Sequence, residues 1–275
     1  MVQFVEIADP DDPRVAAFRG IRERDLVRGG AFVAEGTVVV GQLAASPFFV
    51  PKQLLVLRNR LNGIADLLDH LPDDMPVFVA ERPVIDAVAG FAMHRGVLAV
   101  GEARAVPRLP LPERLAALAA EGRTVVAAVG IANHDNIGGI FRNAAAFAAG
   151  MVLVDETSCD PLYRKAIRVS AGAVLSVPFE RVRAERLPDL LREAGFRAVA
   201  LSPGGTLDLA ALDAVREPVA LVLGAEGPGL PPSLMARMET LRIDMAPGFD
   251  SLNVATSAAI ALQRLYSARG GASEG

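Results

Sequence analysis

The sequence predicts an α/β protein in two parts, and three observations support this. Over residues 10–102 short apolar strands alternate with helical segments, and a second alternating set occupies residues 123–270. Residues 103–122 hold several Pro residues and an Ala/Leu-rich run, which predict a linker carrying a short helix. Because such alternation is typical of sheets with helices packed on them, we expect a small α/β domain over 1–102 and a larger one over 123–270.

The first alternating set predicts a small α/β sandwich. Its strands are apolar runs bounded by Gly, Pro or charged residues, and its helices show helical spacing of apolar residues. The expected strands cover residues 31–35, 53–59, 75–80 and 96–102. The expected helices cover residues 13–29, 36–46, 61–71 and 81–93.

The second set predicts a mostly parallel sheet with helices on both faces. Its expected strands cover residues 124–130, 150–155, 173–182, 196–202, 218–224 and 241–245. Its expected helices cover residues 138–149, 161–170, 185–195 and 253–268. In such sheets ligands bind beyond the carboxyl ends of the strands, and three polar, Gly-rich stretches follow strands here.

Composition narrows the classes of protein. Of the 275 residues 52% are hydrophobic, yet no uninterrupted run reaches the roughly 18 apolar residues of a membrane span. The acidic start MVQFVEIADPDDPR does not resemble a signal peptide. A single cysteine, Cys159, excludes disulfide frameworks, and three scattered histidines oppose a metal cluster. We therefore expect a cytoplasmic protein without a metal or membrane partner.

The net charge of −4 bears on nucleic-acid binding. Proteins that bind nucleic acid through bulk charge are basic, so contact here would need a local patch. The stretch RGIRERDLVRGG offers one, with four basic residues at Arg19, Arg22, Arg24 and Arg28. The alternative is a solvated helix face, because Glu23 and Asp25 are interleaved.

The first polar stretch, NHDNIGGIFRNA at 133–144, places an amide and an arginine between an apolar strand and an apolar helix. An ordinary turn requires neither Asn136 nor Arg142. The alternatives are that Asn136 is a simple turn residue, since Asn is common in turns, and that Arg142 is surface charge.

The second stretch, LGAEGPGLP at 223–231, contains three glycines that allow close backbone approach. A nucleotide-phosphate loop is the rival interpretation. However, no Lys-Ser/Thr pair follows, and Pro228 and Pro231 interrupt the helix that would bind the phosphate. A plain tight turn does not require a carboxylate, so Glu226 is a candidate functional residue.

The third stretch, IDMAPGFDSLNVATSAA at 243–259, is where the last strand leads into the last helix. Ser251 is a candidate N-cap for that helix. Asn253 is expected in the first helical turn, where its amide can both donate and accept. The following run ATSAAIAL offers a face of small residues suited to close helix packing.

Together the three stretches resemble the motifs of the SpoU–TrmH family of RNA ribose 2′-O-methyltransferases, in the knotted SPOUT superfamily. DNIGGIFRNA resembles the first motif, LVLGAEGPGLP the second and IDMAPGFDSLNVATSAAIAL the third, over roughly residues 123–268. One departure is Asp244, where the family usually has Pro. In the other domain, FVAEGTVVV and MHRGVLAV resemble landmarks of the family's ribosomal-protein-like RNA-binding domain, which favours RNA contact for the arginine cluster.

The resemblance implies a C-terminal trefoil knot that binds S-adenosylmethionine, and a homodimer with the site near the interface. By motif position, adenine and ribose would meet the backbone at Leu223, Gly224, Ile243, Met245 and Leu252. The implied catalytic residues are Arg142, Asn136, Glu226, Ser251 and Asn253. Arg142 would act as general base or, as we favour, as a cation on the phosphate next to the ribose, because a guanidinium keeps its proton in proteins and so suits binding better than proton removal. Glu226 would orient Arg142 or its loop, while Ser251 and Asn253 would hold substrate or site geometry.

The implied activity is 2′-O-methylation of a ribose in RNA. Ribosomal RNA is favoured, since the added N-terminal domain is common among rRNA-directed members of the family, and self-protection against a ribosome-targeting antibiotic is a special case. Transfer RNA is the close alternative. Two alternatives come from other classes of protein: a non-catalytic RNA-binding protein and a nucleotide-dependent oxidoreductase. The lack of a Gly-rich turn early in the chain argues against the oxidoreductase.

Overall fold

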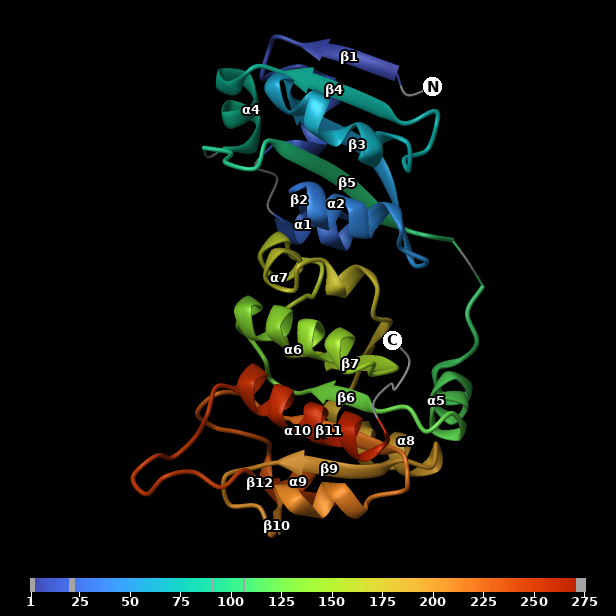
Figure 1. The fold of residues 1–275 in the computed structure, drawn as a ribbon, viewed down its shortest axis with the longest axis vertical. Coiled ribbons are helices and arrows are strands. Elements are labelled where there is room, and N and C mark those ends of the chain that lie inside the picture. Colours follow the sequence, from blue (N-terminus) through green and yellow to red (C-terminus); the bar gives the residue numbers. More distant parts are fainter. Residues whose placement is uncertain (1–2, 20–22, 91, 106, 271–275) are drawn as a thin grey trace. The chain divides into compact units, whose positions relative to one another are not determined.

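The computed structural model describes residues 3–19, 23–90, 92–105 and 107–270 (Figure 1). The chain forms two compact units. The N-terminal unit comprises residues 1–106 together with 161–176, and the C-terminal unit comprises 107–160 together with 177–275. The main division therefore falls inside the expected linker, and one segment of the second alternating set groups with the first unit.

A mixed five-stranded sheet forms the centre of the N-terminal unit. Its strands are β1 (Gln3–Ile7), β2 (Ala31–Glu35), β3 (Phe49–Leu57), β4 (Pro76–Ala80) and β5 (Val97–Ala103), in the order β1-β4-β3-β5-β2. β1 and β3 run parallel to β4, whereas β2 and β3 run antiparallel to β5. Four strands were expected. β1 was missed, because an edge strand with only its last residue, Ile7, buried shows little apolar pattern.

The helices of this unit pack on the sheet and enclose one apolar core. They are the 3-10 helices η1 (Pro13–Phe18), η2 (Arg58–Ile64) and η3 (Ala173–Leu175), and the α-helices α1 (Glu23–Arg28), α2 (Thr37–Ala44), α3 (Ala65–Leu68), α4 (Arg82–Ala89) and α7 (Arg164–Val169). Val15 and Phe18 bring η1 into the core beside Leu55 and Phe78. The single helix expected over 13–29 is wrong, since the backbone is extended at Arg19.

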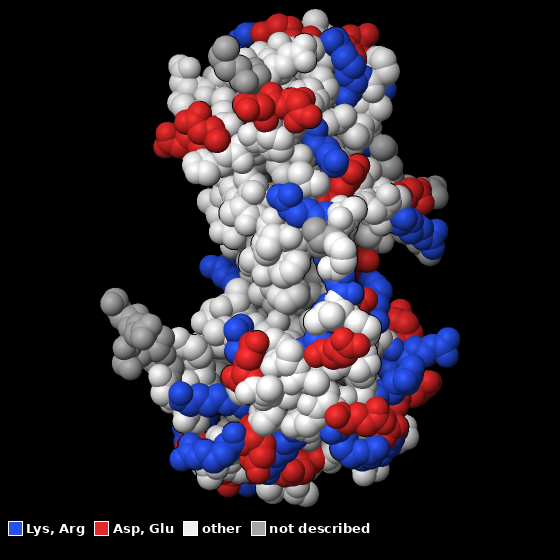
Figure 2. Space-filling view, turned by 90° about the vertical axis from the view of Figure 1, so that its right-hand side faces the viewer, with Lys and Arg blue, Asp and Glu red and all other residues white. Residues whose placement is uncertain are grey.

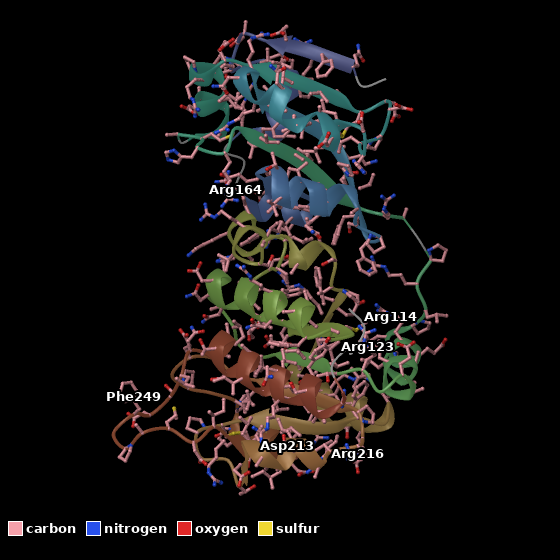
Figure 3. The ribbon with its side chains drawn as sticks, in the orientation of Figure 1. Arg114, Arg123, Arg164, Asp213, Arg216 and Phe249 are labelled. Carbon is pink, nitrogen blue, oxygen red and sulfur yellow. The ribbon has the colours of Figure 1, made fainter. Side chains whose placement is uncertain are left out.

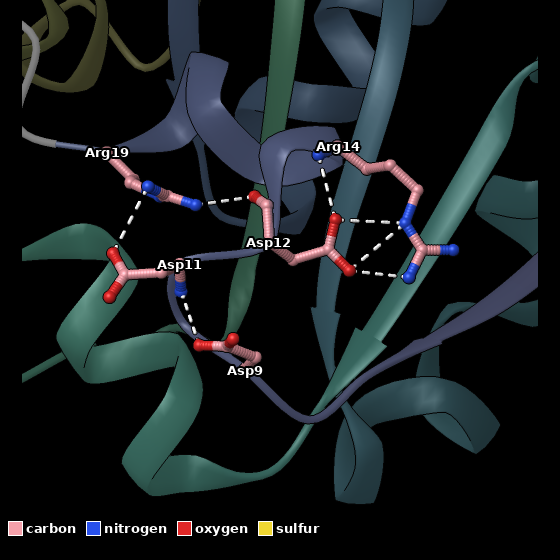
Figure 4. Close-up of polar contacts among 5 residues, drawn as sticks. All are labelled: Asp9, Asp11, Asp12, Arg14 and Arg19. Atoms are coloured by element: carbon pink, nitrogen blue, oxygen red, sulfur yellow. Dashed lines mark hydrogen bonds and ion pairs between the residues drawn. The ribbon is translucent and has the colours of Figure 1, made fainter.

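An acidic turn explains where that first helix stops (Figure 4). Asp12 caps η1 by accepting from the backbone N–H of Arg14 at 2.9 Å. The Arg14 side chain also binds the Asp12 carboxylate, and this hydrogen bond lowers the pKa of Asp12 to about 2. Arg19 folds back onto the same turn, donating to Asp11 Oδ1 at 3.2 Å and to the Asp12 carbonyl at 2.5 Å. These bonds favour an extended Arg19 over a continued helix.

The C-terminal unit is built on a parallel sheet. Its strands are β6 (Val125–Ala128), β7 (Met151–Asp155), β8 (Phe179–Val182), β9 (Arg197–Leu201), β10 (Leu207–Asp208), β11 (Val219–Leu223) and β12 (Glu239–Arg242), in the order β10-β12-β9-β11-β6-β7-β8. The pairings between neighbouring strands are parallel, as predicted. Two details differ: the two-residue β10 was missed, and residues 173–178 precede β8 instead of forming its first half.

Helices cover both faces of this sheet. They are α5 (Leu111–Ala120), α6 (His134–Ala146), α8 (Leu187–Glu193), α9 (Pro232–Met235) and α10 (Val254–Ala268), with the 3-10 helices η4 (Ala184–Arg186) and η5 (Leu209–Ala214). Residues of α5 and α8 share a core cluster with alternate strand residues such as Val125 and Ala127. Because successive side chains of a strand point to opposite faces, Val126 and Ala128 lie on the other face. α6 and α10 pack together and contact β7 and β11 (Figure 1).

The contact between α6 and α10 depends on a small residue. A Cβ atom at Gly139 would lie 2.7 Å from the Cβ of Ala255. Four residues further along α6, Asn143 donates its side-chain N–H to the carbonyl of Ala255 at 2.7 Å. The small-residue face expected around 255–262 therefore does support close helix packing.

Gly139→Ala is expected to destabilise the C-terminal unit by about 1–3 kcal/mol, because the added methyl group overpacks this contact. Gly41→Ala is the matched control. Gly41 also lies within a helix, α2, and its added Cβ would have no atom within 4 Å. The control is expected to stabilise the protein by about 0.5–1 kcal/mol. Urea unfolding of both variants measures the difference, and equal effects would contradict a tight contact at Gly139.

The described residues contain neither a membrane-spanning helix nor a group of metal-ligating side chains. Among those residues, no helix combines the length and apolarity that crossing a membrane requires. The same part of the chain contains no cluster of three His, Cys, Asp or Glu residues suited to a metal ion. On the face drawn in Figure 2, basic and acidic side chains are interspersed, in keeping with the small net charge.

Candidate active site

The three polar stretches follow three strands of the C-terminal sheet at the same edge. β6 leads into α6, β11 leads into the turn at 224–231, and β12 leads into the loop at 243–253. β6 and β11 are neighbours, and β9 separates β11 from β12. Because these strands are parallel, their carboxyl ends meet at one edge, where α/β proteins bind ligands.

One amide joins all three stretches. Asn253 donates from Nδ2 to Asn136 Oδ1 at 2.8 Å and to Glu226 Oε1 at 2.9 Å. Its Oδ1 accepts from the backbone N–H groups of Ala255 and Thr256, at 3.0 and 3.2 Å. Asn253 therefore caps α10 and ties it to α6 and to the turn after β11. Asn136, Glu226 and Asn253, predicted from separate motifs, lie together.

Local sequence explains how these side chains reach one another. Asn133 caps α6 by accepting from the N–H of Asp135 at 2.9 Å, which starts the helix four residues earlier than expected. Asn136 therefore lies in the first turn of α6 and is buried. In the second motif, Gly224 packs against the backbone of the same turn, where a Cβ would lie 2.5 Å from the Leu230 nitrogen. That tight turn supports Glu226.

A pocket of about 520 Å³ opens beside the Asn253 amide. All five residues predicted to contact a cofactor line it, namely Leu223, Gly224, Ile243, Met245 and Leu252. Glu226, Asp250, Ser251 and Asn253 also line it. The sequence analysis missed a further wall formed by Leu201, Ser202 and Pro203, at the carboxyl end of β9. The stretch LSPGG at the end of the expected strand 196–202 was the signal that could have found it.

The other predicted catalytic residues are arranged differently. Ser251 lines the pocket but does not cap α10; that prediction is wrong, because Asn253 occupies the cap position.

Arg142 is exposed on α6, three residues after the contact at Gly139. The carboxylate of Glu226 accepts from Asn253, so its action on Arg142 stays a prediction. Asp244, the departure from the family pattern, is exposed and accepts from Arg242 Nε at 3.0 Å.

The predicted RNA-contact cluster is described in part. Arg22 lies outside the described residues, and the side chain of Arg24, in α1, is likewise outside them. Arg28 is exposed at the end of α1. Arg19 binds the acidic turn of Figure 4. Since the partner carboxylate of Asp11 is largely exposed, this ion pair contributes little to stability, and RNA contact by Arg19 stays a prediction.

Sequence reasoning also missed a buried carboxylate beside the first motif. Asp155, 1% exposed at the end of β7, accepts from Gly130 N–H at 2.9 Å and from the hydroxyl groups of Thr157 and Ser158, each at 2.5 Å. Ser158 Oγ in turn accepts from the N–H of Ile131 at 2.8 Å. Asp155 thus fixes the segment between β6 and α6. Burial raises the pKa of Asp155, but bonds from Ser158, Thr157 and Gly130 outweigh it and hold that pKa below its ordinary value.

Asp155→Asn is expected to destabilise the C-terminal unit by about 1–3 kcal/mol at pH 7, the cost of removing a charged acceptor from buried donors. The folded-state pKa lies below the unfolded value of about 3.9, so the stabilisation exists above about pH 4 and is lost as pH falls through the folded-state pKa. Urea unfolding of wild type and variant at descending pH measures this. A difference between them that persists unchanged in acid would contradict a charged Asp155.

The fold and the site define an α/β protein that binds a ligand at the carboxyl edge of a parallel sheet. The family model described as SpoU rRNA Methylase family matches residues 123–263. An uncharacterized tRNA/rRNA methyltransferase of Mycobacterium tuberculosis is 41% identical over 268 residues, covering 93% of this chain and 89% of the relative. The chain belongs to the SpoU rRNA methylase family of RNA methyltransferases, so the predicted family is confirmed.

Two further comparisons extend this result. The 23S rRNA (adenosine(1067)-2′-O)-methyltransferase of Streptomyces laurentii is 36% identical over 162 residues, 58% of this chain and 60% of the relative. An rRNA methyltransferase from Sinorhizobium meliloti, solved with AdoMet bound, is 25% identical with a TM-score of 0.78. That alignment covers 97% of this chain and 98% of the other. The predicted fold class, a small α/β unit before a parallel-sheet methylase unit, is confirmed.

Proposed function

We propose that this protein transfers a methyl group from S-adenosylmethionine to a ribose 2′-hydroxyl of RNA. The observation that carries the proposal is the Asn253 amide, which joins Asn136 to Glu226, while Asn253 and Glu226 both line the pocket. Three motifs far apart in sequence thus meet beside a space of suitable size. Family membership supports the same reaction.

The pocket fits the proposed cofactor in size, polarity and charge. Its volume of about 520 Å³ lies in the usual range of small-molecule sites. Leu223, Ile243 and Leu252 offer apolar walls for an adenine ring, together with backbone groups that can hydrogen-bond its edge. Glu226 and Asp250 line the same space, and two carboxylates favour a ligand that carries positive charge. The AdoMet-bound relative from Sinorhizobium meliloti supports this assignment.

The residues of this chain would align the acceptor ribose with the methyl group and make its 2′-hydroxyl easier to deprotonate. Bound S-adenosylmethionine supplies an electrophilic methyl group on a sulfonium. Arg142 would hold the phosphate next to the acceptor ribose with two parallel hydrogen bonds and lower the pKa of the 2′-hydroxyl. Asn136, Glu226 and Asn253 would keep α6, which carries Arg142, in register with the pocket. Ser251 would contact the ribose from the facing loop.

Ribosomal RNA is the substrate we favour, with transfer RNA as the alternative. The Streptomyces laurentii relative acts on 23S rRNA, which supports the first, while the Mycobacterium tuberculosis relative is named for both classes. The N-terminal unit would bind RNA, with the arginine cluster at 19–28 as one contact. We also propose a trefoil knot around the pocket and a homodimer, which the family resemblance implies. The functional division at 1–102, 103–122 and 123–270 and a cytoplasmic location are proposed from the sequence pattern and composition.

The experiment is transfer of labelled methyl from S-adenosylmethionine to unmodified rRNA, to assembled ribosomal subunits and, separately, to tRNA. Alkali-resistant label on one RNA would establish both the reaction and the substrate class. Cofactor binding, measured by calorimetry, runs beside it. Absence of both transfer and cofactor binding would refute the proposal, and RNA binding alone would then indicate a non-catalytic RNA-binding protein.

A further inference from the structure

The loop between β12 and α10 carries an exposed aromatic ring next to the pocket. Phe249 is 72% exposed, more than the other large apolar side chains recorded as exposed among the described residues. Figure 3 labels it on the projecting part of this loop. The next four residues along the chain, from Asp250 to Asn253, all line the pocket.

A defined turn holds this ring away from the body of the unit. Phe249 donates its backbone N–H to the carbonyl of Ala246 at 3.3 Å. Pro247 and Gly248 occupy the centre of the turn, and Gly248 has a φ of +88°. Pro followed by a Gly of positive φ is the pattern of a type II turn. The exposed position of Phe249 is therefore set by the backbone.

The length of the loop brings the ring within reach of the acceptor RNA. Asn253 is four positions after Phe249 in the sequence, so their Cα atoms lie at most about 14 Å apart. If the pocket takes the methyl donor, the acceptor ribose lies at its mouth, beside Asn253. A base on the acceptor nucleotide or on its neighbour then comes to the region of Phe249.

The surroundings of the ring suit a base better than a second copy of the chain. A stable protein interface needs about 800 Å² from each partner, and its centre is apolar. Phe249 is instead flanked by Gly248 and Asp250, and Asp250 and Ser251 next to it are exposed. Among its neighbours in the loop, Ala246, Pro247 and Leu252 are exposed and apolar, but Phe249 is the one ring. A single ring matches the area of one nucleobase, and RNA-binding proteins commonly stack unpaired bases on single aromatic side chains.

We propose that Phe249 is a stacking platform for an unpaired base of the RNA substrate, at or next to the methylated nucleotide. The inference rests on the proposed function, because it takes the pocket as the methyl-donor site. It implies that the enzyme acts on a loop, bulge or end in which this base is unstacked from its neighbours.

The first test compares four substitutions of Phe249 in the full chain, on the RNA that wild type methylates. Phe249→Ala is expected to raise the KM for RNA about 5- to 150-fold, the value of one base stack. Phe249→Leu, which stays apolar without an aromatic face, is expected to behave like Phe249→Ala. Phe249→Tyr and Phe249→Trp are expected to stay within about 2-fold of wild type. Leu109→Ala is the matched control, because Leu109 is also an exposed apolar residue of this unit but does not line the pocket.

The second test needs no catalysis. The chain has no tryptophan, so Phe249→Trp reports from one place, and a stacked base is expected to quench its fluorescence when RNA binds. Leu109→Trp should not be quenched. Wild-type KM in Phe249→Leu, a lower oligomeric mass in Phe249→Ala, or unquenched Phe249→Trp in bound RNA would each overturn the stacking proposal. A third outcome separates the two proposals. If RNA quenches Phe249→Trp as expected but wild type transfers no methyl group to that RNA, the proposed function is refuted and base stacking on residue 249 is retained.

Discussion

Arg142→Ala is expected to lower kcat for methyl transfer about 10²- to 10⁴-fold, with the affinity for S-adenosylmethionine unchanged. The reason is that Arg142 is exposed on α6 and is not among the residues that line the pocket, so its contribution falls on the acceptor. Loss of one positioned group that acts on the reacting hydroxyl typically costs this much. Steady-state kinetics and calorimetric cofactor titration measure the two quantities.

Arg142→Lys separates the two roles open to this residue. Lysine keeps the positive charge but loses the planar fork that binds phosphate with two hydrogen bonds. If Arg142 holds a phosphate, Arg142→Lys is expected to remain well below wild type. If it removes the proton, a lysine, with its lower pKa of about 10.4, has a larger fraction in the deprotonated form that can act as a base, and it should restore much of the rate.

Arg216→Ala serves as the control for a general effect of lost charge. Arg216 is also exposed, but it precedes β11 and so lies at the amino edge of the sheet, opposite the site. We expect its substitution to leave kcat unchanged. A similar loss of activity in both variants would contradict the assigned role of Arg142.

Asn253→Ala is expected to reduce both activity and stability, because one side chain performs two tasks. Loss of the cap on α10 costs about 1 kcal/mol of folding free energy. Loss of the donor to Asn136 and Glu226 also leaves two acceptors without their partner, one of them on the buried Asn136, and each unsatisfied buried group adds about 1–3 kcal/mol. We expect a fall in kcat/KM of at least about 10²-fold, measured together with the urea midpoint.

Asn253→Ser divides the two tasks of this residue. Serine caps helices about as well as Asn, but its hydroxyl is too short to bridge to α6 and the turn after β11. Stability is therefore expected to recover in part, while activity stays low. Recovery of activity in Asn253→Ser would contradict a role for the bridge and reduce Asn253 to a helix cap.

Much of the site could be predicted because its residues lie next to strand ends. A strand-like run followed by polar residues defines which edge of a parallel sheet they occupy, so Asn136, Glu226 and Asn253 could be expected to meet. Their individual partners could not be predicted. Ser and Asn are both good N-cap residues, so the residue type does not decide between Ser251 and Asn253. The choice depends on the residue at which the backbone becomes helical, and this is directly after Asn253.

The missed features depend on contacts that are distant in sequence or that lack a periodic pattern. Asp155 is the last residue of an ordinary apolar strand, and only the burial of its carboxylate and its bonds from Thr157 and Ser158 reveal that it supports the segment before α6. The break at Arg19 arises from bonds to the preceding acidic turn, which compete with the apolar spacing that favoured one long helix. Local competition of this kind leaves no periodic signal.

The bridge at Asn253 also determines when the site comes into existence during synthesis. One wall of the pocket and the bridging amide come from the segment between β12 and α10, which leaves the ribosome only after β6 and β11 have been synthesised. The central strands β6 and β11 can pair well before that segment is available, because chains fold progressively from the N-terminus. A nascent chain would therefore hold a nearly complete sheet without a working site, so it could not modify RNA prematurely.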